Sequence, residues 1–492
     1  MPRFGSGQLA ALLVLSGFGY LVGLMPVQPN DFWWHLRMGQ IIASTGAIPH
    51  TNLFAWTLPL DAPFGYGGWL GEWLLYQLYT LGSVELTVFA RNALIVATFG
   101  LMAWEARRRS GSWGLAALVT AIAGVMSLNN VGVRPQDFAW LPFMAFAIVL
   151  ARVSAGQLSM RWLAVLPLAL AVWANVHGTF ILGFALLAGY FLGEALRQVG
   201  LPRKNRSSRL LQGLALVGLA STAATLLNPD GIGVYGFVRD LVATPSQALS
   251  IEGKPPSPNG PAAIAFYLSI LALICVLAYA RQGPRPADLV LVAGFLWLAW
   301  SGQRYVFWYA LIAMPILAEL IASAMPRRHP GRPPSPLYRL VAIVGLLPLI
   351  LGQPWLIERL FSDTTSSNTR AAGQPLLDAE TPVAAASYLV DHPGGNLFNE
   401  LGYGSYLIWA VPEQLVFVDP RIYPFSVELL EDYVAVGEGH GSLELLERYG
   451  ADRVLLSRKL QPKLAQVLGT ASGWQREYAD TGSEIWRRSP IG

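Results

Sequence analysis

The sequence predicts an α-helical polytopic membrane protein with about 11 transmembrane helices and a small C-terminal α/β domain. Three observations predict this fold class. Of the 492 residues, 53% are hydrophobic and only 13% are charged, whereas soluble domains carry about 25% charged residues. Apolar stretches of near bilayer length recur from residue 8 to residue 357. The composition then changes, and residues 380–488 show the pattern of short helices and strands.

The apolar stretches define the predicted spans. They lie at 8–27, 84–104, 113–129, 137–151, 162–176, 179–196, 210–227, 263–280, 287–302, 305–325 and 338–357. The first follows Arg3 and lacks a clear small-residue cleavage site, so we interpret it as a retained span. Arg91 lies inside the second span, where an arginine needs a carboxylate or a watery cavity. Glu72 and Glu85 are its candidate partners.

Basic residues cluster in every second connection between the predicted spans. The clusters comprise Arg3, then Arg107, Arg108 and Arg109, Arg152 and Arg161, Arg197, Arg203, Lys204, Arg206 and Arg209, Arg281 and Arg285, and Arg327, Arg328, Arg332 and Arg339. The positive-inside rule places these connections and the N-terminus in the cytoplasm, and an odd number of spans places the C-terminal domain outside. Because the basic residues form no single patch, we expect no nucleic-acid partner.

These features divide the chain into three parts. We expect a transmembrane domain at 1–361 with a large first outer loop at 28–83, a polar linker at 362–379, and an extracytoplasmic α/β domain at 380–492. In the last part the pattern predicts helices at 381–391, 427–436, 442–449 and 461–468, strands at 396–398, 415–418 and 453–456, and a hairpin of 474–478 with 484–486. Asp419-Pro420-Arg421 follows a predicted strand end, where α/β domains place ligand sites. A structural salt bridge in that turn is the alternative that we favour.

The first outer loop has an unusual composition at its start. Within seven residues it contains Asp31, Trp33, Trp34, His35 and Arg37. About forty residues later, Glu72 lies between Trp69 and Trp73. Ionisable groups at a membrane edge are costly, which makes them functional candidates. The alternative is an aromatic belt with snorkelling charges, but a belt does not need two carboxylates.

The other outer connections hold the remaining unusual polar residues. They are Arg134, His177, Asn228, Glu252 and Arg304. Each has a structural alternative: the arginines snorkel, Asn228 caps a helix, and His177 bonds a backbone carbonyl. Their location on one side of the membrane favours a shared site. Arg134 and Arg304 each begin a predicted helix, whose positive end favours an anion. We therefore expect both to converge on one cavity and bind a phosphate.

These residue types suit transfer of a group from a lipid phosphate. A carboxylate is a general base for an acceptor hydroxyl, arginine stabilises a phosphate leaving group, and aromatic faces stack on sugar rings. The sequence contains no credible motif for nucleotide binding, zinc proteolysis or serine hydrolysis, and we expect no nucleotide cofactor. The alternative is a non-enzymatic membrane transporter or assembly partner for lipid-linked glycans. A transporter should show inverted repeats and broken mid-membrane helices, and we find no convincing repeat.

Several segments resemble one family. Residues 31–35, with Gly39 and Ile48-Pro49, resemble the first outer loop of bacterial GT-C glycosyltransferases, and residues 69–73 resemble the later part of that loop. Further segments resemble uncharacterised members, namely 173–178, 227–231, 399–404 and 418–421. The resemblance covers most of the chain. It implies an inverting GT-C-like enzyme of the bacterial inner membrane, which moves a sugar from a polyprenyl-phosphate donor to a glycan, lipid or protein acceptor on the outer face.

The resemblance also assigns roles. In that superfamily an acidic residue early in the first outer loop is the catalytic base or a metal contact, and by motif position this implies Asp31. Many members have a second acidic residue beside it. Phe32 stands there in this chain, so Glu72 is the candidate for the second charge, and the use of a divalent metal stays open. The predicted substrate-binding residues are Trp33, Trp34, His35, Arg37, Arg134, His177, Asn228, Glu252 and Arg304.

Overall fold

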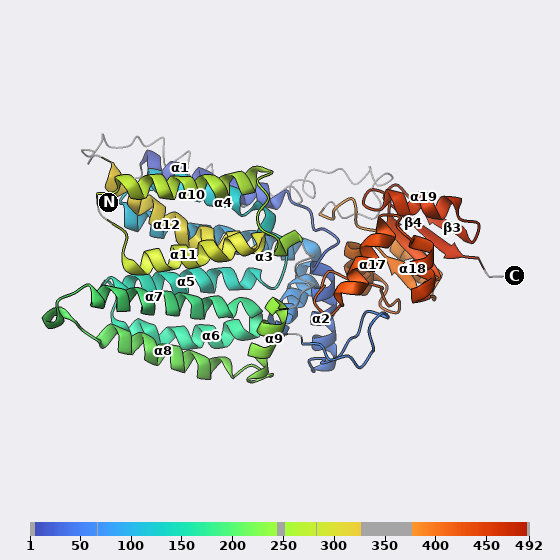
Figure 1. Cartoon of the computed structure of the whole chain (residues 1–492), viewed down its shortest axis with the longest axis horizontal. Helices are drawn as coiled ribbons and strands as arrows, with labels where there is room; N and C mark the ends of the chain where they lie inside the picture. Colours follow the sequence, from blue (N-terminus) through green and yellow to red (C-terminus); the bar gives the residue numbers. More distant parts are fainter. Residues whose placement is uncertain (1–4, 66, 244–250, 282, 326–375, 490–492) are drawn as a thin grey trace.

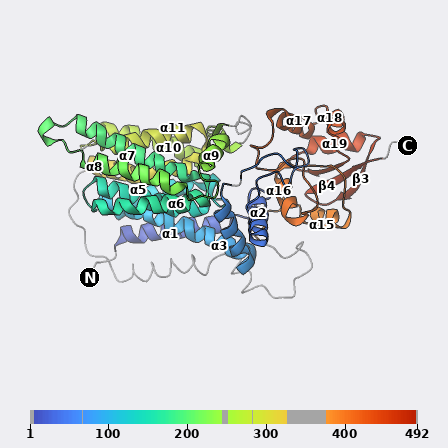
Figure 2. The same cartoon turned by 90° about the horizontal axis from the view of Figure 1, so that it is seen from below.

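The computed structural model describes residues 5–65, 67–243, 251–281, 283–325 and 376–489. A bundle of long helices occupies one end of the molecule, and a smaller α/β domain lies at the other end (Figures 1 and 2). The first loop, which contains helix α2 (Phe32–Thr45), lies at the junction of the two parts.

The bundle helices overlap the predicted spans. They are α1 (Ser6–Gly23), α3 (Trp69–Ser110), α4 (Trp113–Met126), α5 (Asp137–Ser154), α6 (Val165–Val176), α7 (Ile181–Val199), α8 (Arg209–Thr225), α10 (Pro261–Tyr279), α11 (Pro286–Ser301) and α12 (Val306–Ala324). Helix α3 begins at Trp69, inside the predicted first outer loop at 28–83, and has non-helical backbone at Gly82 and Ser83. The predicted span at 338–357 lies outside the described residues. Within the described part, 6 helices are long and apolar enough to cross a membrane, so the chain is a multi-pass membrane protein.

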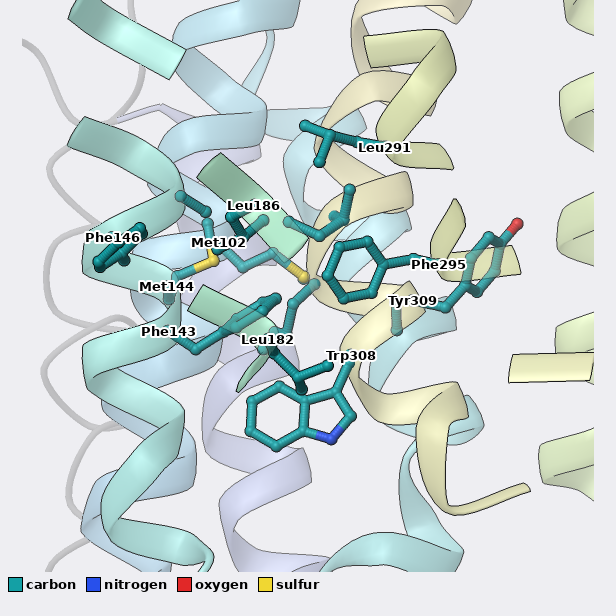
Figure 3. Close-up of a cluster of buried hydrophobic side chains, with 14 of the residues drawn as sticks. Met102, Phe143, Met144, Phe146, Leu182, Leu186, Leu291, Phe295, Trp308 and Tyr309 are labelled. Atoms are coloured by element: carbon teal, nitrogen blue, oxygen red, sulfur yellow. The ribbon is translucent and has the colours of Figure 1, made fainter. Parts of the chain in front are cut away.

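Large apolar side chains fill the centre of the bundle (Figure 3). Phe143 of α5 lies edge-on to Phe295 of α11 and to Trp308 of α12, with ring centroids 5.7 and 4.8 Å apart. Such edge-to-face pairs favour one fixed arrangement of the helices. In α12, 78% of the apolar window is buried, compared with 28% in α10. Helix α12 is therefore central, and α10 lies on the outside of the bundle.

The two ends of the bundle differ in charge. The N-terminus and the basic connection between α7 and α8 lie at the end away from the C-terminal domain (Figure 1). Successive bundle helices alternate in direction, so the described connections with Arg107 to Arg109, with Arg152 and Arg161, and with Arg281 and Arg285 fall at that same end. The basic cluster at 327–339 lies outside the described residues. The prediction that basic residues gather opposite the C-terminal domain therefore agrees with the arrangement of the helices.

The predicted partners of Arg91 were wrong. Its guanidinium donates to the backbone carbonyl oxygens of Val22 (2.8 Å) and Val131 (3.1 Å) and to Oδ1 of Asn92 (3.1 Å). These carbonyl groups lie at the ends of α1 and η1 (Leu128–Asn130), where the backbone has acceptors without helical partners. Arg91 therefore ties two chain connections to α3.

The C-terminal domain contains the predicted helices and most of the predicted strands. Its elements are α15 (Val383–Asp391), β1 (Leu397–Asn399), α16 (Leu401–Ala410), α17 (Val427–Gly437), α18 (Ser442–Tyr449), β2 (Arg453–Ser457), α19 (Pro462–Thr470), β3 (Trp474–Ala479) and β4 (Ser483–Arg488). The strand order is β1-β2-β4-β3, with β1 parallel to β2 and the other pairs antiparallel. Helix α16 was not predicted, because its glycines gave it the composition of a loop.

The predicted strand at 415–418 was also wrong. Val416 instead forms isolated parallel bridges with Leu397 of β1 and with Ala55 of the first loop. Its amide donates to the carbonyl oxygen of Phe54 (2.9 Å), and its own carbonyl accepts from the amide of Trp56 (3.0 Å). The first loop therefore extends the C-terminal sheet, and this joint fixes the position of the domain over the end of the bundle.

Candidate functional site

A cavity of about 230 Å³ lies where the bundle, the first loop and the C-terminal domain meet. Eight of the predicted site residues line it: Asp31, Trp34, His35, Glu72, Arg134, His177, Glu252 and Arg304. They come from six segments that are far apart in the sequence. The cavity is therefore a product of the tertiary fold.

Two crossing helices bring the first residues together. A Cβ atom on Gly39 of α2 would lie 2.1 Å from the backbone carbonyl oxygen of Glu72, so only glycine allows α2 to approach α3 this closely. His35 lies one helical turn before Gly39 and faces the same helix. Its Nδ1 is 3.0 Å from Oε1 of Glu72. Glu72 is only 2% exposed, and its Oε2 has no hydrogen-bond partner among the described residues.

The environment keeps the His35 ring neutral. Burial lowers its pKa well below the ordinary value, and the interactions with His177 and with the guanidinium groups of Arg134 and Arg421 lower it further. In the neutral ring one nitrogen donates and the other accepts. If Nδ1 donates to Glu72, then Nε2 is an acceptor. The ring of Trp34 packs against that of His35, with centroids 3.5 Å apart and an angle of 31° between the ring planes, and this contact restricts the imidazole.

Asp31 precedes the first turn of α2, with a side chain that is 19% exposed. Its Oδ1 accepts from Nε1 of Trp34 (3.3 Å), and its Oδ2 lies 3.2 Å from Nε of Arg134. Burial raises the pKa of Asp31, and the guanidinium of Arg134 partly offsets that rise. The carboxylate is therefore a stronger proton acceptor than an ordinary aspartate.

Helix α16 of the C-terminal domain holds the chain around Asp31 in place. The hydroxyl of Ser405 accepts from the backbone amide of Trp34 (3.1 Å) and donates to the carbonyl oxygen of Asn30. Ser405 is fully buried, where an unmade hydrogen bond is costly. The two bonds therefore position the chain on both sides of Asp31.

Arg134 is shared between two carboxylates. Its Nη1 and Nη2 donate to Glu252 at 2.9 and 2.6 Å, while its Nε faces Asp31. Burial opposes the charge of Arg134, but Asp31 and Glu252 raise its pKa above the ordinary value. Burial likewise raises the pKa of Glu252, and Arg134 outweighs this and lowers it overall. Glu252 thus pairs with the two terminal guanidinium nitrogens of Arg134. The same pair of donors would suit a phosphate.

His177 and Arg304 line the side of the cavity formed by the bundle. His177 follows the last residue of α6, and its Nδ1 accepts a hydrogen bond from the amide of Thr179 at 3.1 Å. This bond differs from the predicted structural alternative, in which His177 bonds a backbone carbonyl. Burial, then Arg134 and Arg304, lower the pKa of His177 to about 4. The neutral ring therefore carries its proton on Nε2. Arg304 lies in η7 (Gln303–Tyr305), with its guanidinium carbon 5.1 Å from the ring of Tyr305.

Solved structures show which fold this is. The oligosaccharyltransferase of Archaeoglobus fulgidus aligns with 98% of this chain and 74% of its own length, at 10% identity and a TM-score of 0.54. Arabinofuranosyltransferase AftD from Mycobacteria aligns with 99% of this chain but only 40% of its own length, at 15% identity and a TM-score of 0.53. The chain therefore shares the fold of these two transferases. No protein-family model matches the chain, and no curated protein matches it.

Three predicted residues lie outside the lining of the cavity. Trp33 is 2% exposed and packs edge-on against α16. Arg37 donates within its own helix to Oε1 of Gln40 (2.6 Å). Trp33 and Arg37 are four residues apart and share one face of α2, whereas Trp34 and His35 face the cavity. Asn228 is buried and donates to the carbonyl oxygen of Ala174 (2.9 Å), which joins the ends of α6 and α8.

The C-terminal domain adds cavity residues that the candidate set omits. Pro420, Arg421, Ile422 and Tyr423 line the same cavity. The favoured salt bridge exists, because Arg421 donates to both oxygens of Asp419 at 2.7 Å. The sequence signal for these residues was their position directly after a predicted strand. Because Pro420 and Arg421 line the cavity, the interpretation of this turn as part of a ligand site also has support.

No group of three or more His, Cys, Asp or Glu residues in the described ranges is placed to hold a metal ion. Asp31 and Glu252 already share the positive charge of Arg134, which opposes a second cation. The chemistry below is therefore derived from side chains alone.

Proposed function

We propose that the protein is a membrane glycosyltransferase that moves a sugar from a polyprenyl-phosphate donor to a glycan, lipid or protein acceptor. The proposal rests on one observation above all: Asp31 and Arg134 lie 3.2 Å apart in the one cavity that the first loop, the bundle and the C-terminal domain enclose. A base for an acceptor hydroxyl and a group for a phosphate thus lie side by side. The GT-C fold, shared with an oligosaccharyltransferase and an arabinofuranosyltransferase, supports the same class of reaction.

In the proposed reaction the acceptor oxygen attacks the anomeric carbon of the donor sugar. A new glycosidic bond forms, the bond from the anomeric carbon to the phosphate oxygen breaks, and polyprenyl phosphate leaves with the bonding electrons. The acceptor proton passes to the carboxylate of Asp31, which acts as general base. Attack opposite the leaving group inverts the configuration at the anomeric carbon.

The leaving phosphate gains negative charge during this step. Arg134, Arg304 and neutral His177 supply donors along the bundle side of the cavity, and such donors stabilise a developing anion. Arg134 is available to the phosphate once its two hydrogen bonds to Glu252 break. The hydrogen bond between His35 and Glu72 orients both side chains beneath the reacting groups.

The proposed orientation places the cavity and the C-terminal domain on the outer face of the bacterial inner membrane. The basic connections support this orientation, because they lie at the opposite end of the bundle. Reporter fusions after Arg109 and Arg206 should report the cytoplasm, and a C-terminal fusion should report the outside. A C-terminal reporter in the cytoplasm would reverse the side assigned to every site residue.

The activity itself is tested with purified protein in lipid nanodiscs. Radiolabelled polyprenyl-phosphate hexoses and pentoses are supplied together with membranes from cells that lack the gene, which provide the native acceptors. We expect label to appear in a membrane glycan, lipid or protein and free polyprenyl phosphate to accumulate in equal amount. Use of a nucleotide sugar, but of none of the lipid-phosphate sugars, would refute the proposal.

A further inference from the structure

A short turn of the C-terminal domain packs against the first loop. The turn comprises residues 419–423. Its Arg421 is 3% exposed and forms a bidentate salt bridge with Asp419. The guanidinium carbon of Arg421 lies 5.0 Å from the ring centroid of Phe54 and 4.7 Å from that of Phe64. A cation between two aromatic faces is held by both. The first loop therefore fixes the position of a segment that follows it by more than 300 residues.

The backbone of this turn is strained. Ile422 has a φ of 54°, and only one other non-glycine residue in the described ranges, Ser83, has a positive φ. For a β-branched residue such a value is a genuine outlier. The amide of Tyr423 bonds the carbonyl oxygen of Arg421 at 2.5 Å, which closes a three-residue turn around Ile422. A γ-turn with a positive central φ is a rare and strained form.

Contacts on both sides of Ile422 hold the strain in place. The hydroxyl of Tyr423 donates to the carbonyl oxygen of Gly65 (3.2 Å), and its ring stacks on Phe64 with centroids 5.1 Å apart. The amide of Phe425 donates to the carbonyl oxygen of Ile422 (3.0 Å). Strain of this kind persists only where the surroundings over-determine the backbone, and it concentrates at functional sites.

The strained turn lines the same cavity as Asp31 and the phosphate-binding groups. Ile422 and Tyr423 line the cavity, and Asp419 already neutralises the charge of Arg421. At Ile422 and Tyr423 the C-terminal domain thus offers an aliphatic and an aromatic surface, whereas Arg134, Arg304 and His177 lie on other segments of the lining. The two surfaces suit different substrates, because a phosphate needs charged donors and the CH-rich face of a sugar needs apolar contact.

We infer that the turn at Ile422 is the acceptor-positioning wall of the site, and that the Ile422 side chain holds a carbohydrate acceptor against Asp31. The inference rests on the proposed glycosyl transfer and adds to it the residue that selects the acceptor. Ile422 is a positioning residue, and the bond changes are those given above. When the wall is lost, water takes the place of the acceptor oxygen, so the donor yields free sugar and polyprenyl phosphate.

The test measures how the donor sugar is divided between acceptor and water. Ile422→Gly keeps the positive φ without strain and removes the side chain, so folding is preserved or improved. With labelled donor and native acceptor membranes, we expect the ratio of transferred to hydrolysed sugar to fall at least about tenfold. Ile422→Val, which keeps a β-branched side chain, should restore most of the ratio. Inhibition by undecaprenyl phosphate, a probe of the donor side, should stay within about twofold of wild type.

Ser83→Gly is the matched control, because it relieves the other positive φ at a position outside the cavity lining. Its ratio should equal that of the wild type. An unchanged ratio in Ile422→Gly would overturn the inference, as would an equal loss of undecaprenyl phosphate inhibition. A wild-type protein that only hydrolyses the donor would also overturn it. A wild-type protein that consumes none of the lipid-phosphate donors would instead refute the proposed function on which the inference rests.

Discussion

The backbone carbonyl oxygen of Glu72 lies 2.1 Å from the point where Gly39 would carry a Cβ atom. No side chain separates α2 from α3 at this crossing. The hydrogen bond between His35 and Glu72 forms one turn away, so its geometry depends on how closely the helices approach. Gly39 thus controls the site although it does not line the cavity.

Gly39→Ala should push the two helices apart and lower both stability and transfer. Overpacking of this kind costs about 1–3 kcal/mol, and we expect transfer to fall at least about tenfold because catalytic geometry tolerates little displacement. Thermal unfolding and the donor assay measure the two effects. Gly100→Ala is the control, because Gly100 of the same helix α3 has nothing within 4 Å of its Cβ position. Wild-type values for both variants would contradict the role of the crossing.

Asp31→Asn keeps the size of the side chain and removes its charge. Loss of a general base lowers rates by about 10²-fold or more, so transfer should fall by that factor while the protein still folds and inserts. Asp61→Asn changes the same residue type at an exposed position of the same loop and should leave transfer unchanged. Full activity of purified Asp31→Asn would remove Asp31 from the mechanism and make Glu72 the candidate base.

Arg304 should act through both its charge and its planar shape. Arg304→Lys keeps the charge and loses the bidentate geometry, so we expect about tenfold weaker donor use, and about 10²-fold or more for Arg304→Ala. The measurement is kcat/KM for the lipid-phosphate donor, with membrane insertion checked by fractionation. Arg203→Ala, exposed in the connection between α7 and α8, is the control. Wild-type activity of the lysine variant would show that the planar geometry is irrelevant, and equal activity of the lysine and alanine variants would show that the charge alone contributes nothing.

Glu252→Gln should improve donor binding. The carboxylate of Glu252 occupies the fork of Arg134, and a partly exposed ion pair of this kind is worth up to about 1 kcal/mol. Removing its charge should therefore lower the KM for the donor by up to about fivefold. Glu444→Gln, exposed on α18, should have no effect. A higher KM in Glu252→Gln would mean that Glu252 contributes to donor binding rather than competing with it.

His177 should make stability depend on pH in acid. Its pKa is about 4 in the folded protein and ordinarily 6.5, so between these values the unfolded chain binds the proton first. Stability therefore falls as the pH drops from about 6.5 towards 4. His177→Gln should show a smaller drop in Tm between pH 7.5 and pH 4.5 than the wild type does. An equal drop in both proteins would contradict the buried neutral state of the ring.

The helices of the bundle could be predicted because each depends on a local property, the length of an apolar run. The same holds for α15 and α17 to α19, whose apolar residues recur at helical spacing. Helix α16 was missed for a tertiary reason. A Cβ on its Gly404 would lie 2.2 Å from the carbonyl oxygen of Val418, so the helix needs glycine where it packs, and the composition then favours a loop.

The site was predictable only in part, for a similar reason. Asp31, Trp34 and His35 could be found as polar or aromatic groups at a membrane edge. Composition also selected Trp33, which packs against α16 instead. Composition does not show which face of α2 meets the cavity, because that depends on the helices packed against α2. Two partners of Arg91 are the backbone carbonyls of Val22 and Val131, and because every residue carries such a group, the sequence had no signal for them. The cavity turn at Ile422 depends on contacts with Phe54 and Phe64 across the whole chain.

The bridge between Ala55 and Val416 has a consequence for how the protein is made. About 360 residues separate the two strands, and a ribosome adds about 5–20 residues per second. The first loop therefore waits on the order of 20–70 s for its partner, during which most bundle helices enter the membrane. A nascent chain that has completed its bundle still has an open cavity. The wall formed by residues 420–423 is thus added to the cavity only after the C-terminal domain has been made, long after the first loop.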